Sequence, residues 1–191
     1  MGKRKYGLTD HEEMLAVRDG DIGKLGLLFE KHHTYLFNFF LLLTKNRQAS
    51  EDMVQDVFYR MLKYRRTYRS DGNFKTWMFS IARNARKDFF REHKAEFDTI
   101  DETNDFASGD PNLEELLVRN DEVALVRRAL DGLPDDKREI LIMSRFHDMR
   151  YEEIGNVLGC SVGTVKVRIY RAMRALTESY KKLSGEISHG L

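Results

Sequence analysis

The sequence predicts an all-α protein with two small helical domains joined by an acidic, flexible linker, the second domain containing a helix-turn-helix. Three observations support this fold class. Only 2 of the 191 residues are proline, 33% are charged and 41% are hydrophobic, and few stretches alternate β-branched residues, which favours helices over strands. Apolar residues recur at helical spacing along most of the chain. One acidic segment interrupts this recurrence, so we expect domains at 1–94 and 113–191 and a linker at 95–112.

The first helices are located from their capping residues. Thr9 and Glu12 have the spacing of a capping box, Asp21 is expected to cap the next helix, and Ser50 the one after. The most apolar run, residues 35–43, is nine residues long and includes Asn38, whereas spanning a bilayer takes about 20 apolar residues. It is therefore expected to be a core helix without membrane insertion.

No secretory signal is predicted, because the N-terminus lacks an apolar core segment. The only cysteine, Cys160, cannot form an intramolecular disulfide. It is expected at an apolar packing position as a buried, inert thiol. Together these features predict a cytoplasmic protein.

The helix predicted from Ser50 has a clear apolar stripe, formed by Met53, Val54, Val57, Phe58, Met61 and Leu62. Its opposite face is expected to display Asp52, Gln55, Asp56 and Tyr59. The residues of a turn, 69–73, come next. In the helix after it, Trp77, Ile81, Ala85 and Phe89 are spaced to face a core.

The second domain is expected to start a helix at Leu133-Pro134, with Asp135 and Asp136 in its first turn. Residues 151–172 then read as two helices around a turn at Gly159. Gly155 is small where the two backbones approach, and Ile154, Leu158, Val165 and Ile169 are apolar where the helices must pack. An ordinary helical hairpin is the alternative interpretation.

The second helix of this pair favours a DNA-binding motif over a hairpin. Ser161 is expected to cap it, which places Gly163 in the first turn, where a missing side chain lets the helix end approach a phosphate or a base. Lys166, Arg168, Arg171 and Arg174 give a cationic edge suited to phosphates and base edges of the major groove.

The charges are unevenly distributed although the net charge is only +1. Residues 59–94 carry eleven Lys and Arg against three Asp and Glu, and residues 161–182 carry six against one. Residues 95–123 between them carry one against ten. Residues 59–94 also include eight aromatic residues, a combination that suits single-stranded nucleic acid. A solvated basic face over an aromatic core is the alternative.

Together these stretches resemble the extracytoplasmic-function group of bacterial RNA polymerase sigma factors, over about residues 21–93 and 113–180. "SEDMVQDVF" is similar to the helix of that family that binds core polymerase, and "FKTWMFSIARNARKDFFR" to its promoter-melting helix. "YEEIGNVLGCSVGTVKVRIYRA" resembles the module that reads the minus-thirty-five element. Three residues depart from the family pattern: Gly155 stands where alanine is usual, Val167 where serine is frequent, and Met173 where arginine is frequent.

The resemblance implies a sigma factor that brings core polymerase to promoters and helps open them, with no catalytic residue, metal or cofactor of its own. It implies contacts with the β′ clamp helices and the β subunit of polymerase, with duplex and single-stranded promoter DNA, and with an anti-sigma factor. The acidic linker would run near the RNA exit path; a simple tether is equally compatible with its sequence.

The implied site residues form three groups. Polymerase binding is expected at Asp52, Gln55 and Asp56, although a solvated acidic face has the same pattern. Minus-ten binding is expected at Tyr68, Arg69, Asn73, Phe74, Asn84 and Lys87, where a flipped base would be captured. Minus-thirty-five binding is expected at Ser161, Gly163, Thr164, Lys166, Arg168 and Arg171.

Two other classes of protein explain the sequence less well. A helix-turn-helix regulator with an N-terminal sensor or dimerisation domain explains the second domain, but it has no need of a basic aromatic surface at residues 51–91. An enzyme is disfavoured because the chain has no phosphate-cradling GxxxxGK, no HExxH, and no metal-ligand spacing among its six histidines.

Overall fold

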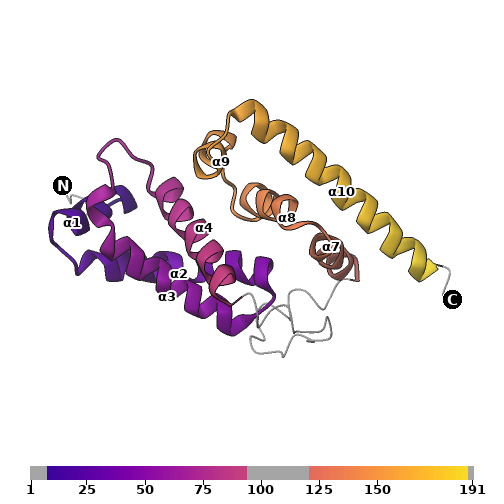
Figure 1. Cartoon of the computed structure of the whole chain (residues 1–191), viewed down its shortest axis with the longest axis horizontal. Helices are drawn as coiled ribbons and strands as arrows, with labels where there is room; N and C mark the ends of the chain where they lie inside the picture. Colours follow the sequence, from indigo (N-terminus) through magenta and orange to yellow (C-terminus); the bar gives the residue numbers. More distant parts are fainter. Residues whose placement is uncertain (1–7, 94–120, 189–191) are drawn as a thin grey trace, which may run out of the picture. The chain divides into compact units, whose positions relative to one another are not determined.

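The computed structural model describes residues 8–93 and 121–188, and every regular element within these ranges is a helix (Figure 1). This confirms the predicted all-α class. The chain divides into two compact units. Helices α1 to α4 lie in the first, and α7, α8, η2, α10 and most of α9 in the second. The predicted linker, 95–112, and the predicted start of the second domain at residue 113 lie outside the described residues, so the domain boundaries stay predictions.

Helix α1 (Asp10–Asp19) begins where its sequence predicts. The Glu12 amide donates to Thr9 Oγ1 and the Thr9 amide donates to Glu12 Oε2, which together form the capping box. Because the Glu12 carboxylate accepts the hydrogen bonds of the Thr9 amide and hydroxyl, its pKa is lowered. The start of α1 is therefore fixed by two residues three positions apart in the sequence.

The next two starts differ from the prediction. Helix α2 (Lys24–Thr44) begins at Gly23 without a side-chain cap, so Asp21 does not cap it. Helix α3 (Arg47–Lys63) begins earlier than expected because Asn46 caps it, its Oδ1 accepting from the Ala49 amide at 2.9 Å. Ser50 is buried inside α3 and its hydroxyl donates to the Asn46 carbonyl at 2.6 Å. Ser50 is thus a core residue whose hydroxyl has a hydrogen-bond partner, and it does not cap α3.

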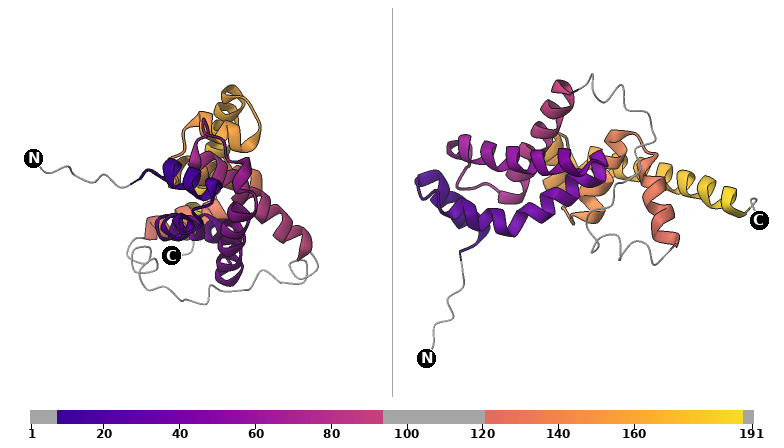
Figure 2. Two further views of the ribbon diagram at one scale, coloured as in Figure 1. Left: turned by 90° about the vertical axis from the view of Figure 1, so that its left-hand side faces the viewer. Right: turned by 90° about the horizontal axis from the view of Figure 1, so that it is seen from below.

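Helices α2 and α3 run side by side and α4 (Phe74–Glu92) packs on α3 (Figures 1 and 2). The apolar run at residues 35–43 lies in α2 and supplies core residues, as expected; Phe39 meets Phe79 of α4 edge to face at 5.0 Å. The stripe predicted for α3 is buried except for Leu62, which is half-buried. No helix within the described ranges is both long and apolar enough to cross a membrane.

Helix α4 buries only one residue of the predicted stripe, Ala85. Trp77, Ile81 and Phe89 are only half-buried, and the buried positions of the helix are Phe74, Met78, Phe79, Ala82, Ala85 and Arg86. The buried set follows the row of Phe74, Met78 and Ala82. At about 100° per residue, Trp77 points about 100° away from Met78, so the row that starts at Trp77 begins at the edge of the buried face.

The second unit is built around the long helix α10 (Val162–Ser188), against which α7 (Asp121–Asp131) and α8 (Asp135–Leu141) pack (Figure 1). Pro134 precedes α8 and Asp135 and Asp136 lie in its first turn, as predicted. The π-helical turn η2 (Ile142–Phe146) extends α8 and leads to α9 (Tyr151–Leu158). Three residues separate the end of α9 from the start of α10.

Candidate functional site

Helices α9 and α10 are joined by a tight turn that the sequence predicts in detail. Gly159 closes α9 in the left-handed conformation, with φ 66°, which favours glycine. A Cβ on Gly155 would lie 2.8 Å from the Cys160 carbonyl oxygen, closer than side-chain carbons normally approach. Ser161 caps α10, its Oγ accepting from the Thr164 amide at 3.2 Å. The turn therefore depends on two glycines and one cap.

Cys160 lies in this turn but is half-buried, which corrects the prediction of a buried thiol. The residue sits at the tip between two helices, where its carbonyl, not its side chain, makes the close approach to Gly155. Among the residues that the structure describes, no cluster of His, Cys, Asp and Glu side chains is arranged to hold a metal ion.

Helix α10 has a buried and an outward face near its start. Val165, Ile169 and Ala172 are buried. Lys166, Arg168, Arg171 and Arg174 are exposed, so the cationic edge predicted for this helix lies on the surface. Gly163 is also exposed, and the only atom that a Cβ there would meet within 4 Å is Ser161 Oγ at 3.8 Å. The first turn of α10 is therefore open on the side of Gly163.

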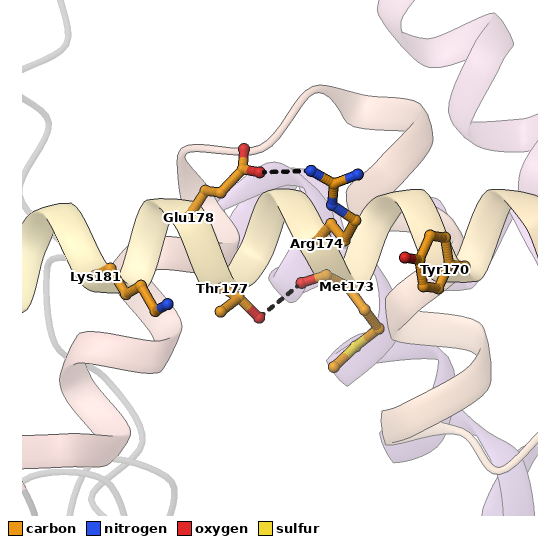
Figure 3. Close-up of a pocket in the computed structure, with 6 residues that line it drawn as sticks. All are labelled: Tyr170, Met173, Arg174, Thr177, Glu178 and Lys181. Atoms are coloured by element: carbon orange, nitrogen blue, oxygen red, sulfur yellow. Dashed lines mark hydrogen bonds and ion pairs between the residues drawn. The ribbon is translucent and has the colours of Figure 1, made fainter.

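A shallow pocket of about 320 Å³ follows along the same helix (Figure 3). Tyr170, which is 65% exposed, and Arg174 lie at its start. Arg174 also pairs with Glu178 at 3.5 Å, which offsets part of its charge. Tyr170 was not singled out from the sequence, because an aromatic residue beside a buried isoleucine reads equally well as core.

The turn between η1 (Arg65–Thr67) and α4 is flanked by two buried aromatic residues, which the sequence predicts to bind a base. Tyr68 and Phe74 are 2% and 5% exposed, so neither ring presents a free face for stacking in this structure, and their place in minus-ten binding stays a prediction. The other turn residues are exposed except Gly72, which is half-buried. Arg69 pairs with Asp71 at 2.9 Å, and Asn73 Oδ1 caps α4 by accepting from the Thr76 amide.

Helix α1 holds this turn through the Tyr68 hydroxyl. His11 Nδ1 lies 2.6 Å from Tyr68 Oη, which donates to the Gly72 carbonyl at 3.3 Å. The 2.6 Å contact is compatible with both imidazole tautomers, because Nδ1 can donate to the hydroxyl or accept from it. Burial raises the pKa of Tyr68 to about 12, with a further contribution from the charge of Asp10. The tyrosine thus stays neutral and bridges α1 to the turn.

Asn84 and Lys87 lie on another part of α4. Both are exposed and line a shallow pocket of about 380 Å³ with Arg60, Tyr64, Ile81, Asp88 and Arg91. Asn73 caps the helix eleven residues before Asn84, so the two are separated by about 16 Å along the helix axis. The exposed residues among those predicted for minus-ten binding therefore form two groups, one at the turn and one around this pocket.

The acidic face of α3 is exposed as predicted at Asp52 and Gln55, while Asp56 is partly covered. Arg60 binds Asp56 at 2.8 Å and Asp88 of α4 at 2.6 Å. The hydrogen bond from Arg60 is the main cause that lowers the pKa of Asp88. Sequence reasoning missed this bridge, although the spacing of four between Asp56 and Arg60 was a signal for its first half.

The fold and these surfaces define a two-unit helical protein with an exposed cationic helix after a tight turn. The sigma-70 region 2 family model matches residues 28–96, and the sigma-70 region 4 model matches residues 124–176. The chain belongs to the sigma-70 family of RNA polymerase sigma factors, and within it to the extracytoplasmic-function group.

Curated relatives agree with this assignment. The chain is 27% identical over 186 residues to the RNA polymerase sigma-H factor of Pseudomonas aeruginosa, covering 93% of this chain and 96% of that one. It is 28% identical over 188 residues to the ECF RNA polymerase sigma-E factor of Escherichia coli, covering 92% and 96%. It is also 28% identical over 166 residues to the ECF RNA polymerase sigma factor SigX of Bacillus subtilis, covering 84% and 86%.

Solved structures share the fold. CnrH in complex with the cytosolic domain of CnrY is similar with a TM-score of 0.67 and 24% identity, covering 88% of this chain and 95% of that one. The sigma factor RpoE in complex with the anti-sigma factor NepR from Bartonella quintana is similar with a TM-score of 0.60 and 24% identity, covering 82% and 96%.

Proposed function

We propose that this protein binds core RNA polymerase in the cytoplasm, directs it to promoters by recognising minus-thirty-five and minus-ten elements, and aids strand opening. It acts as an initiation factor and leaves the chemistry of RNA synthesis to the polymerase. The observation that carries the proposal is the capped start of α10, where lysine and arginine side chains surround an open helix end on a chain of the sigma-70 family.

The minus-thirty-five duplex would be bound by the first turns of α10. Lys166, Arg168 and Arg171 are exposed there and supply charge for phosphates and donors for base edges. Ser161 and Thr164 hydrogen bond to each other at 3.0 Å around the helix cap. Gly163 leaves space for the DNA backbone beside the unpaired amides of the first turn.

The minus-ten strand would follow the surface of α4. Asn84 and Lys87, beside the exposed Tyr64, offer an amide, a cation and an aromatic face around one shallow pocket, which are the groups that bind unstacked bases. Arg69 and Asn73 would contact the same strand at the turn. Tyr68 and Phe74 would act indirectly, by holding that turn in place.

Polymerase would bind the acidic face of α3. Asp52 and Gln55 are exposed and Asp56 is partly exposed on one side of that helix, where cationic side chains of the β′ clamp helices would pair with the carboxylates. The second unit would contact the β subunit. An anti-sigma factor would hold the protein inactive, a proposal supported by the fold shared with a sigma factor solved as a complex with the anti-sigma factor NepR.

Run-off transcription with purified core polymerase and a pool of genomic promoters tests the proposal. The wild-type protein should yield promoter-dependent products. Arg171→Ala should lose most of them because it removes one donor from the duplex-binding face, whereas Lys182→Ala, which changes an exposed cation farther along α10, should not. The absence of any promoter-dependent product with wild-type protein would refute the proposal and favour a helix-turn-helix regulator.

A binding assay separates the polymerase contact from the DNA contacts. Asp56→Ala should weaken binding to core polymerase while the full-length protein retains its affinity for minus-thirty-five duplex. Unchanged affinity for core polymerase would remove Asp56 from the polymerase surface, whereas equal loss of both affinities would indicate misfolding.

A further inference from the structure

Val167 is an apolar side chain in the middle of the cationic face of α10. It is 48% exposed, although valine is a weaker helix former than most residues used on helix surfaces. At about 100° per residue it points about 200° away from the buried Val165. Val167 therefore lies opposite the core face, where packing within the unit does not require it.

The neighbours of Val167 on this face are the residues proposed to bind DNA. Lys166 and Arg168 flank it in sequence, and Arg171 lies one turn later. Gly163 lies one turn earlier and has no side chain to cover it. A small apolar surface thus lies among cations, with the exposed Tyr170 one turn later, and is open toward the start of the helix.

The chemistry of the major groove supplies one apolar partner for such a position. Thymine carries a C5 methyl group at the groove edge, whereas cytosine presents a hydrogen there and an N4 amino donor beside it. Valine has no hydrogen-bonding group, so it gains from burying a methyl and leaves the amino group of cytosine without an acceptor. A polar side chain at this position would not favour thymine in this way.

We propose that Val167 is a specificity-determining residue that packs against the C5 methyl of one thymine in the duplex bound by α10. This rests on the proposed function, because it presumes that the start of α10 lies in the major groove. Val167 is the sixth residue of the helix, and residues of the first turns of a recognition helix contact base edges. The surrounding cations would hold the duplex, while Val167 selects one base.

Deoxyuridine substitution tests the contact, because it removes only the thymine methyl. The wild-type chain, assembled with core polymerase, is titrated with a promoter duplex from the run-off pool in which each upstream thymine is replaced singly. One replacement should weaken binding about fourfold, the effect of losing one buried methyl. The other replacements should change affinity little.

The variant Val167→Ala assigns that effect to this side chain. With it, the ratio of the two affinities at the sensitive thymine should fall from about fourfold to about one. Alanine is the better helix former, so folding is preserved, and an unchanged thermal unfolding midpoint confirms this. Tyr170→Ala is the matched control on the same face and should leave the ratio at about fourfold.

Two outcomes would overturn the inference. One is that no upstream thymine is sensitive to loss of its methyl; the other is that the fourfold ratio survives in Val167→Ala. Arg171→Ala distinguishes these from failure of the proposed function. If that variant weakens all duplexes while the thymine ratio is independent of Val167, only the specificity assignment is wrong.

Discussion

Tyr68→Phe is the most direct test of how α1 holds the turn before α4. The substitution removes one oxygen, which lies 2.6 Å from His11 Nδ1 and 3.3 Å from the Gly72 carbonyl oxygen, and it leaves the ring in place. A net intramolecular hydrogen bond contributes about 0.5–1.5 kcal/mol. Because the second bond is long, we expect the free energy of unfolding to fall by about 1–2 kcal/mol. Urea unfolding at neutral pH with an unchanged m-value would measure this loss.

The same substitution should change how stability depends on alkaline pH. The pKa of Tyr68 is raised from 10.0 to about 12 in the folded protein, so folding favours the neutral phenol. Its contribution is therefore fully present below pH 10 and is lost as the pH rises toward 12. Wild-type stability should decline over this window more steeply than that of Tyr68→Phe, which has no phenol to ionise.

Tyr64→Phe is the matched control, because Tyr64 is an exposed tyrosine close in sequence. It should change neither the free energy of unfolding nor the alkaline decline by a comparable amount. The reasoning would be refuted if Tyr68→Phe were as stable as the wild type, or if the two proteins lost stability in parallel between pH 10 and 12.

Three further substitutions test other contacts. Gly155→Ala should lower the free energy of unfolding by about 1–2 kcal/mol in thermal or urea melts, because the added Cβ would lie 2.8 Å from the Cys160 carbonyl oxygen. The better helix propensity of alanine offsets only part of this overpacking cost. Gly163→Val should weaken promoter binding in a filter assay about tenfold or more yet barely move the melting temperature, since a Cβ there has open space; an equal effect on both would count against a DNA role. Arg60→Gln removes the partner that lowers the pKa of Asp88. The variant should therefore be less stable than the wild type at pH 7, and the difference should shrink as acid protonates Asp88 in the wild type. A difference in stability that does not depend on pH would contradict this.

The sequence was most informative where structure is set by neighbours along the chain. The capping box at Thr9, the left-handed turn at Gly159 and the cap at Ser161 are all confirmed, because each depends on hydrogen bonds or backbone angles within about four residues. The prediction that Ser50 caps α3 is wrong because two residues close in sequence could both form the cap. Asn46 offered an equally good cap one turn earlier, and sequence alone does not rank two competing caps.

The minus-ten surface was less predictable because its architecture is not local. Tyr68 reads as a free aromatic residue beside a polar turn, yet it is covered through a contact with His11, 57 positions away. Arg60 likewise joins α3 to α4 through Asp88, 28 positions away. No spacing rule reports pairings at such separations, so the sequence named the right segments but not which side chains face solvent. The assigned DNA and polymerase contacts stay predictions.

Because Arg60 is paired with Asp56, a cation from a binding partner competes with Arg60 for this carboxylate of α3. Asp56 already has an internal counter-ion, so an incoming cation must displace or share Arg60. Among the described residues, the partner of Asp52 is the neutral amide of Gln48, at 3.1 Å. Added salt should therefore weaken contacts made through Asp52 more than those made through Asp56, because the latter exchange one ion pair for another. The two carboxylates, adjacent on one helix, would then give polymerase binding two different sensitivities to ionic strength.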